Sequence, residues 1–203
     1  MTTKVTSGMT SGVVKDSDKA AKAGITSGAN ESKVVQLNSS GLIPDTYVAA
    51  NAHQWRYTGD FAVGTGEVVV DTGDGWEQVD TTPQGVTGTV MTVNEGVFTF
   101  PSTGLWLVTL NALFARNSSD VTLIVADLFS TTGSGGSTEV RVGQGCSSLH
   151  SNNLQTTVVV SSLINVSSTS DVKVKVKVSA SSSGGDFKGN SSFNRSYFTF
   201  VKI

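Results

Sequence analysis

The fold of this 203-residue chain is decided by the stretch Asn94-Glu-Gly-Val-Phe-Thr-Phe-Pro-Ser-Thr-Gly-Leu-Trp-Leu-Val-Thr-Leu-Asn-Ala-Leu-Phe114. It is the longest apolar passage in a sequence otherwise rich in Ser, Thr and Gly. Two runs of β-forming residues, Val97–Phe100 and Leu105–Phe114, flank a turn that contains Pro101 and Gly104. The pattern predicts a hydrophobic hairpin in the densest part of the core.

Outward from this stretch, the chain from residue 53 onward alternates short β-type runs with turn signals such as Asn94-Glu-Gly96 and Gly184-Gly185. The remaining predicted strands are Gln54–Phe61, Glu67–Val70, Trp76–Val79, Thr87–Val93, Val121–Phe129, Thr138–Val142, Leu154–Leu163, Val172–Ala180 and Ser196–Ile203. Many short strands without helical periodicity predict an all-β sandwich or barrel. The longest polar inserts, Ser130–Ser137 and Gly143–Asn153, are predicted to be exposed loops at the ends of the sandwich.

Two strands are apolar on both faces. In Leu105–Phe114, one face is wholly apolar and carries Trp106 and Phe114, whereas the other mixes leucines with Thr109 and Asn111. In Ser196–Ile203, the side chains of Phe198 and Phe200 point one way. Those of Tyr197, Val201 and Ile203 point the other way. A two-sheet sandwich covers only one face of each sheet, so a neighbouring subunit is the simplest cover for the second face.

The strand Val172–Val178 has a simpler pattern, because valines alternate with Lys173, Lys175 and Lys177. It is predicted to be half-buried with a solvated face, and the lysines would discourage aggregation between strand edges. A patch that binds an acidic glycan is the functional alternative for the same lysines.

Composition restricts the partners. Only 15% of the residues are charged and the net charge is −2, so no overall field favours nucleic acid or an anionic membrane. No apolar run is long enough for membrane insertion, and the first residues do not form a secretory signal, so synthesis in the cytoplasm is expected. The single cysteine, Cys146, excludes an intrachain disulfide.

The first 52 residues differ from the rest. Residues 1–30 are poor in large hydrophobic side chains and are predicted to be a flexible attachment arm. Residues 31–52 are predicted to be a short linker module, with a strand at Lys33–Leu37 and a turn at Asn38–Gly41. Residues 53–203 then form the β domain. The text around Lys33-Val-Val-Gln-Leu-Asn-Ser-Ser-Gly-Leu-Ile-Pro44 resembles a module that is common in bacteriophage appendage proteins, where it joins an attachment segment to a distal domain.

A second resemblance concerns the β domain. The run from Asn94 to Val108, with a strand ending in Phe-Pro and a Gly turn leading into a strand that opens on a large aromatic, resembles the jelly roll of tumour necrosis factor (TNF) and complement globular-head domains. The segments Val158–Asn165, Asp171–Val174 and Arg195–Ile203 are similar to later strands of that family. The resemblance implies an antiparallel jelly-roll β-sandwich that assembles as a compact homotrimer and carries out no chemistry.

Together the two resemblances imply a non-enzymatic structural protein of a virion: a head fibre, a capsid decoration or a component of a tail fibre. Residues 1–50 would contact other virion proteins, and the trimer would place aromatic side chains near its axis or core. The side chains predicted for the trimer interface are Trp106, Phe114, Tyr197, Phe198 and Phe200. The alternative function is a host-attachment module whose loops Ser130–Ser137 and Gly143–Asn153 bind a surface glycan or protein.

No catalytic, cofactor or metal site is predicted. The run Asp71-Thr-Gly73 is similar to an aspartic-protease signature, but that chemistry needs a second aspartate and no second copy occurs. Asp71 and Asp74, with Glu77 and Asp80 nearby, leave a calcium site open as an alternative.

Other reactive residues form no motif. His53 and His150 are far apart, and Cys146 and His150 lack a third group to orient them. A depolymerising enzyme would need two carboxylates across a groove. The sequence does not pair any of the candidates Asp120, Asp127, Glu139 and Asp186.

Overall fold

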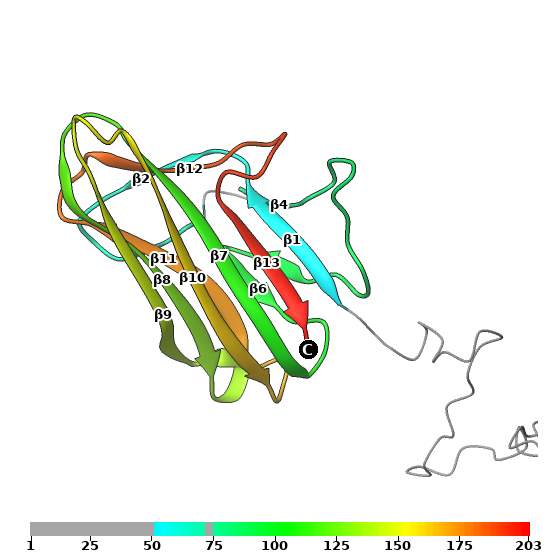
Figure 1. Cartoon of the computed structure of the whole chain (residues 1–203). Helices are drawn as coiled ribbons and strands as arrows, with labels where there is room; N and C mark the ends of the chain where they lie inside the picture. The colour runs from blue at the N-terminus through cyan, green and yellow to red at the C-terminus, as the bar shows by residue number, and fades with distance from the viewer. Residues whose placement is uncertain (1–50, 72–74) are drawn as a thin grey trace, which may run out of the picture. The chain divides into compact units, whose positions relative to one another are not determined.

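The computed structural model describes residues 51–71 and 75–203, which form two packed antiparallel sheets (Figure 1). The strands are β1 (Ala52–Tyr57), β2 (Asp60–Val63), β3 (Val68–Val69), β4 (Trp76–Gln78), β5 (Thr92–Asn94), β6 (Val97–Thr99), β7 (Gly104–Arg116), β8 (Val121–Thr132), β9 (Thr138–Leu149), β10 (Gln155–Val166), β11 (Lys173–Ala180), β12 (Gly185–Lys188) and β13 (Tyr197–Lys202). A single turn of 3-10 helix at Ser134–Gly136 joins β8 to β9. The predicted all-β antiparallel fold is confirmed.

The two sheets are named here sheet A and sheet B. Sheet A has the order β2-β12-β7-β13-β1-β4, and β10 pairs with the other edge of β7. Sheet B has the order β5-β6-β11-β8-β9, and β3 pairs with β11. Neighbours in each sheet come from distant parts of the chain, such as β1 beside β13 and β7 beside β13. This crossing of chain segments between two sheets is the jelly-roll arrangement.

The stretch Asn94–Phe114 joins the two sheets instead of forming one hairpin, so that prediction is wrong. A tight turn at Glu95 (φ 49°) and Gly96 (φ 69°) joins β5 to β6, which pairs with β11 in sheet B. After the turn that follows Phe100, β7 lies in sheet A. The indole N–H of Trp106 donates to the carbonyl oxygen of Ser102 at 3.2 Å and fixes this crossover. Large apolar side chains are therefore supplied to both walls of the core.

The core lies between the sheets and is dominated by aromatic rings. Phe98 of sheet B contacts four rings of sheet A at centroid distances of 5.1–5.7 Å. Those four rings belong to Trp55, Trp76, Phe198 and Phe200. Phe98, Phe198 and Phe200 are 0% exposed in the single chain. Edge-to-face and tilted pairs of this kind add to the free energy gained by burying the rings.

Several predicted element boundaries are corrected. The predicted strand Gln54–Phe61 is two strands, β1 and β2, and most of Thr87–Val93 is irregular before β5. The predicted loop Gly143–Asn153 is wrong up to Leu149, because β9 continues along β8 to that residue. Strand β12 was not predicted at all. Both β9 and β12 are short of large apolar side chains, so hydrophobic alternation does not reveal them.

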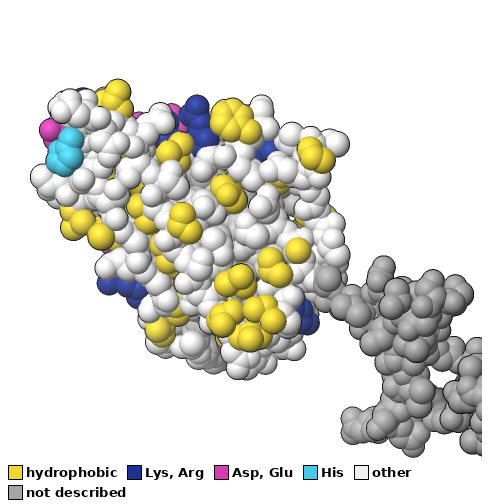
Figure 2. Space-filling model, viewed as in Figure 1, with side chains coloured by type: hydrophobic (Ala, Val, Ile, Leu, Met, Phe, Trp, Pro, Cys, Tyr) yellow, Lys and Arg dark blue, Asp and Glu magenta, His cyan; other side chains and the backbone are white. Residues whose placement is uncertain are grey.

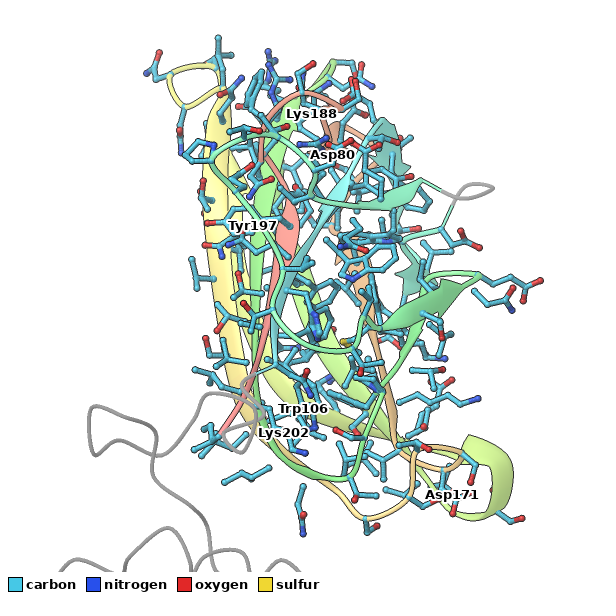
Figure 3. All side chains as sticks on the ribbon, turned by 90° about the vertical axis from the view of Figure 1, so that its right-hand side faces the viewer. Asp80, Trp106, Asp171, Lys188, Tyr197 and Lys202 are labelled. Carbon is cyan, nitrogen blue, oxygen red and sulfur yellow. The ribbon has the colours of Figure 1, made fainter. Side chains whose placement is uncertain are left out.

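The two predicted binding loops lie at opposite ends of the sandwich. The turn between β8 and β9 lies beside Asp171, because Thr131 Oγ1 donates to the carbonyl oxygen of that residue. Asp171 lies at the end of the sandwich where β1 begins (Figure 3). The turn between β9 and β10 lies at the other end, where β1 finishes. Figure 3 shows the same separation, with Asp171 and Lys202 at one end and Lys188 and Asp80 at the other. One binding surface cannot include both loops.

The predictions for the arm and linker, up to residue 50, lie outside the described residues. Strand β1 begins at Ala52, one residue before the predicted start of the β domain. Within residues 51–71 and 75–203, no helix has the length and apolar character needed to cross a membrane.

Candidate functional site

The surface with the clearest functional character is the outward-facing side of strands β10, β7 and β13, called here the outer face of sheet A. Side chains alternate along each strand, so every second residue points away from the core. The outward side chains are Val159, Ser161 and Leu163 of β10, Leu105, Leu107, Thr109, Asn111 and Leu113 of β7, and Tyr197, Thr199 and Val201 of β13. Ile203 extends this set, since its N–H donates to the carbonyl oxygen of Leu105 at 2.9 Å.

The apolar side chains of this face form a continuous group. Strand register places Leu163 beside Leu107 and Leu107 beside Val201. Leu105 and Ile203 follow at the end where β1 begins. Leu163 is 58% exposed and Ile203 is 70% exposed. Figure 2 shows hydrophobic side chains gathered on this side, over the lower ends of β7, β10 and β13. An apolar group of this kind on one sheet face marks an interaction surface.

Three polar side chains of the outer face form hydrogen bonds within the chain. The hydroxyls of Thr109 and Ser161 lie 3.0 Å apart, and Gln54 Nε2 donates to Thr199 Oγ1 at 3.1 Å. None of the outward residues named above is charged, and Figure 2 shows charged side chains mainly at the margins of this side. Covering the face would therefore bury no unpaired charge, which is the most costly step in forming an interface.

Four of the five predicted trimer-interface side chains do not lie on this face. Trp106, Phe114, Phe198 and Phe200 are 0% exposed, because they fill the chain's own core. They have no surface left for a second subunit, so their assignment to an interface is corrected. Only Tyr197 points outward, and it is partly buried.

The missed interface candidates are the leucines and valines on the opposite side of the same strands. The signal was present in the sequence. In β7 the wholly apolar side faces the core, and the mixed side with Leu105, Leu107 and Leu113 faces outward. A side on which leucines alternate with Thr and Asn suits a surface that is covered only on assembly.

The calcium alternative is not supported by the described residues. Arg56 is only 2% exposed, and its guanidinium contacts Glu77, Asp80 at 2.7 Å and the Thr81 hydroxyl at 2.8 Å. Two of the four candidate carboxylates are therefore paired with Arg56, and Asp74 lies outside the described residues. Among those residues, no group of three or more His, Cys, Asp or Glu side chains is arranged to hold a metal ion.

The four carboxylates considered for catalysis each face a cation. The ion pairs are Asp120 with Arg116 at 3.0 Å, Asp127 with Arg141 at 3.0 Å, Glu139 with Lys175 and Lys177, and Asp186 with Lys188 at 3.8 Å. Two carboxylates that act as acid and nucleophile, or acid and base, must flank one substrate bond. In these pairings each carboxylate is already bound to a cation, and the Asp127–Arg141 pair joins the neighbouring strands β8 and β9.

The lysine strand belongs to such a network on the outer side of sheet B. Lys177 lies 2.7 Å from Glu139 and 3.3 Å from Glu67, and its ammonium is 4.5 Å from the centre of the Phe129 ring. Hydrogen bonds from Lys175 and then Lys177 lower the pKa of Glu139, and the bond to Glu139 raises the pKa of Lys177. Lys175 and Lys177 therefore have carboxylate partners already, which argues against a glycan patch on them.

The remaining reactive side chains stay apart. His53 is 2% exposed and stacks on the Trp106 ring, with 5.9 Å between the ring centroids. His150 lies in the turn after β9, with Nδ1 3.6 Å from Asp120. Cys146 is exposed on β9 with its thiol free. His53 is buried in the core and Cys146 is on the surface, so His53 cannot act as a catalytic partner of Cys146.

No family model and no curated protein matches this chain. Solved structures do resemble it. Murine APRIL at pH 8.0 aligns with a TM-score of 0.53 and 11% identity over 76% of this chain and 99% of that chain. The Eiger TNF from S. frugiperda aligns with a TM-score of 0.52 and 15% identity over 76% of this chain and 93% of that chain. At identities this low, the likeness shows the fold alone. The chain is an antiparallel jelly roll with a TNF-like fold.

Proposed function

We propose that the chain is a non-enzymatic structural protein that assembles as a homotrimer through the outer face of sheet A. The observation that carries the proposal is the uncharged, partly apolar surface formed by Leu105, Leu107, Leu163, Val201 and Ile203. Exposed in a monomer, these side chains would cost about 25 cal/mol for each Å² of apolar area left in water. The number three comes from the resemblance to TNF and complement globular heads.

The size of the face suits this role. It is about ten residues long at about 3.4 Å per residue and three strands wide at about 4.8 Å per strand, which gives roughly 490 Å². A stable interface buries about 800 Å² on each partner. The face would thus supply most of one side of an interface. In a ring of three, each subunit offers this face to a different surface of its neighbour.

We further propose that the trimer is a virion component, namely a head fibre, capsid decoration or tail-fibre component, to which residues 1–50 anchor the β domain. This part rests on the resemblance of residues 33–44 to the bacteriophage appendage module. Strand β1 begins at Ala52, two residues after this proposed anchor.

The assembly claim is tested by charge substitution within the apolar group of the outer face of sheet A. Leu163→Asp is expected to give a folded monomer, because each interface would have to bury an unpaired carboxylate. Leu123→Asp is the matched control, since Leu123 is 46% exposed on β8 of sheet B. Multi-angle light scattering measures the mass, and circular dichroism confirms the fold. A Leu163→Asp protein that keeps the wild-type trimer mass would refute this use of the face.

The virion claim is tested separately by labelling the chain on purified particles. Gold-tagged antibody against the β domain is expected to mark one defined site on the virion by electron microscopy. Particles that lack the chain altogether would overturn the virion role and leave the assembly claim standing.

A further inference from the structure

The turn between β12 and β13 presents an aromatic ring to solvent at the end of the sandwich where β1 finishes. Phe193 is 52% exposed and is the one aromatic among the exposed large hydrophobic side chains of residues 51–71 and 75–203. Tyr197, directly after the turn, pairs with Arg56 near the end of β1. The turn therefore lies opposite the end at which Ala52 enters the domain.

The ring sits on a turn that is held by hydrogen bonds. Asn190 Oδ1 accepts the backbone N–H groups of Ser192 at 2.8 Å and Phe193 at 3.1 Å. The Asn190 N–H donates to the carbonyl oxygen of Tyr57 at 2.7 Å, and the Thr81 hydroxyl donates to that of Ser192 at 3.2 Å. A ring fixed in this way is exposed by the fold and is preorganised for contact with a ligand.

A cation without a carboxylate partner accompanies the ring. The guanidinium of Arg195 lies over Phe193, 5.4 Å from the ring centre. Arg56, Arg116 and Arg141 each form an ion pair with a carboxylate. Within the part of the chain that the structure describes, Arg195 forms none. Its charge and its planar donors are therefore available to an anion from outside the chain.

We propose that Phe193 and Arg195 form a binding site for an acidic sugar, one whose ring carries a carboxylate. The C–H face of a pyranose would pack on the exposed part of the Phe193 ring, and Arg195 would donate to the carboxylate. Ser191 and Ser192 are exposed and directly precede Phe193 in the turn, and their hydroxyls suit sugar hydroxyls. A second polar group is close by: Asn194 Nδ2 donates to Gln54 at 3.1 Å, while its buried Oδ1 has no partner among the described residues.

The site is distinct from the outer face of sheet A, so it does not depend on the proposed assembly. It is also distinct from Lys175 and Lys177 of β11, whose ammonium groups are paired with Glu139 and Glu67. An acidic peptide is the rival ligand for an arginine beside an aromatic ring. The sugar is favoured because two exposed serines precede Phe193, and because Arg195 is the cation that lies over its ring among the described residues.

The test is a titration of the full chain with three probes: sialyllactose, the neutral sugar lactose, and a short polyglutamate peptide. Ligand-observed NMR monitors the binding of each probe. Sialyllactose is expected to bind with a Kd on the order of 1 mM, which is typical of a single small contact. Lactose is expected to bind at least tenfold more weakly. Equal binding of the two sugars, or binding of polyglutamate alone, would overturn the proposal.

Variants place the binding at this turn. Phe193→Ala and Arg195→Gln are each expected to weaken sialyllactose binding at least tenfold with an unchanged thermal midpoint. Leu154→Ala removes another exposed apolar side chain, and Lys173→Gln removes a cation at the far end; both are expected to bind like wild type. Unchanged binding by Phe193→Ala would refute the site. Light scattering on the same samples separates this result from a failure of assembly.

Discussion

At the residue scale, His53 is the side chain whose environment most restricts its chemistry. It lies on the core side of β1, with neither ring nitrogen hydrogen-bonded in the described residues. Burial lowers its pKa below the usual value near 6.5. The charged group nearest to it along β13 is Lys202, which follows its partner Phe200 by two residues on the same side of the strand. Its ring stacks on Trp106 and its partner on β13 is Phe200, so these two described contacts offer no anion to a protonated His53.

This arrangement predicts a loss of stability in mild acid. Above about pH 6.5 the imidazole is neutral in both the folded and the unfolded chain. Below that pH the unfolded chain binds a proton that folded His53 does not, so the free energy of unfolding falls by up to about 1.4 kcal/mol per pH unit until the folded group titrates. Urea denaturation between about pH 7.5 and pH 5 measures this slope.

The control for that prediction is the second histidine. His53→Phe keeps an aromatic ring against Trp106 and is expected to flatten the slope, whereas His150→Asn is expected to leave it unchanged because His150 is exposed. NMR titration of the wild type gives an independent reading. A His53 resonance that titrates near pH 6.5 in the folded chain would contradict the account.

At the scale of the element, the closing of the sandwich between β9 and β10 depends on glycine. A side-chain carbon added at Gly145 would overlap Cγ1 of Val158 and lie 3.1 Å from Cγ2 of Val160. Valine is stiff at χ1, so these side chains cannot turn away easily. We expect Gly145→Ala to cost about 1–3 kcal/mol of stability through overpacking, measured as a lower urea midpoint.

A glycine in open space provides the comparison. Gly66 has nothing within 4 Å of the position of an added carbon, so Gly66→Ala is expected to be neutral or slightly stabilising. Equal stability of Gly145→Ala and Gly66→Ala would show that β9 does not pack tightly on β10.

The elements also show how far the sequence could be interpreted. The strong alternation in β7 and β13 predicted both strands and separated their two sides, because apolar side chains at every second position have few other uses. The same pattern could not say which side faces the core, so Trp106 and Phe200 were assigned to an interface. The polar β9 and the four-residue β12 are held by pairing with distant strands, which local sequence does not encode. Pairing of β6 with β11 instead of β7 is likewise a long-range choice.

At the scale of the whole molecule, the anchoring role proposed for residues 1–50 makes a separate prediction. Removal of these residues is expected to leave the thermal midpoint and the oligomeric mass of the β domain unchanged, since the core cluster between the two sheets extends from Trp55 to Phe200. The shortened chain is expected to be missing from purified virions. Normal incorporation of the shortened chain would contradict the role proposed for this segment.

The central claim is that copies of this chain associate through the outer face of sheet A. Multi-angle light scattering of the full chain, over a range of concentrations and at about physiological salt, measures it most directly. We predict a single species with three times the 21.1 kDa mass of the chain. A species of 21.1 kDa at every concentration would contradict the claim.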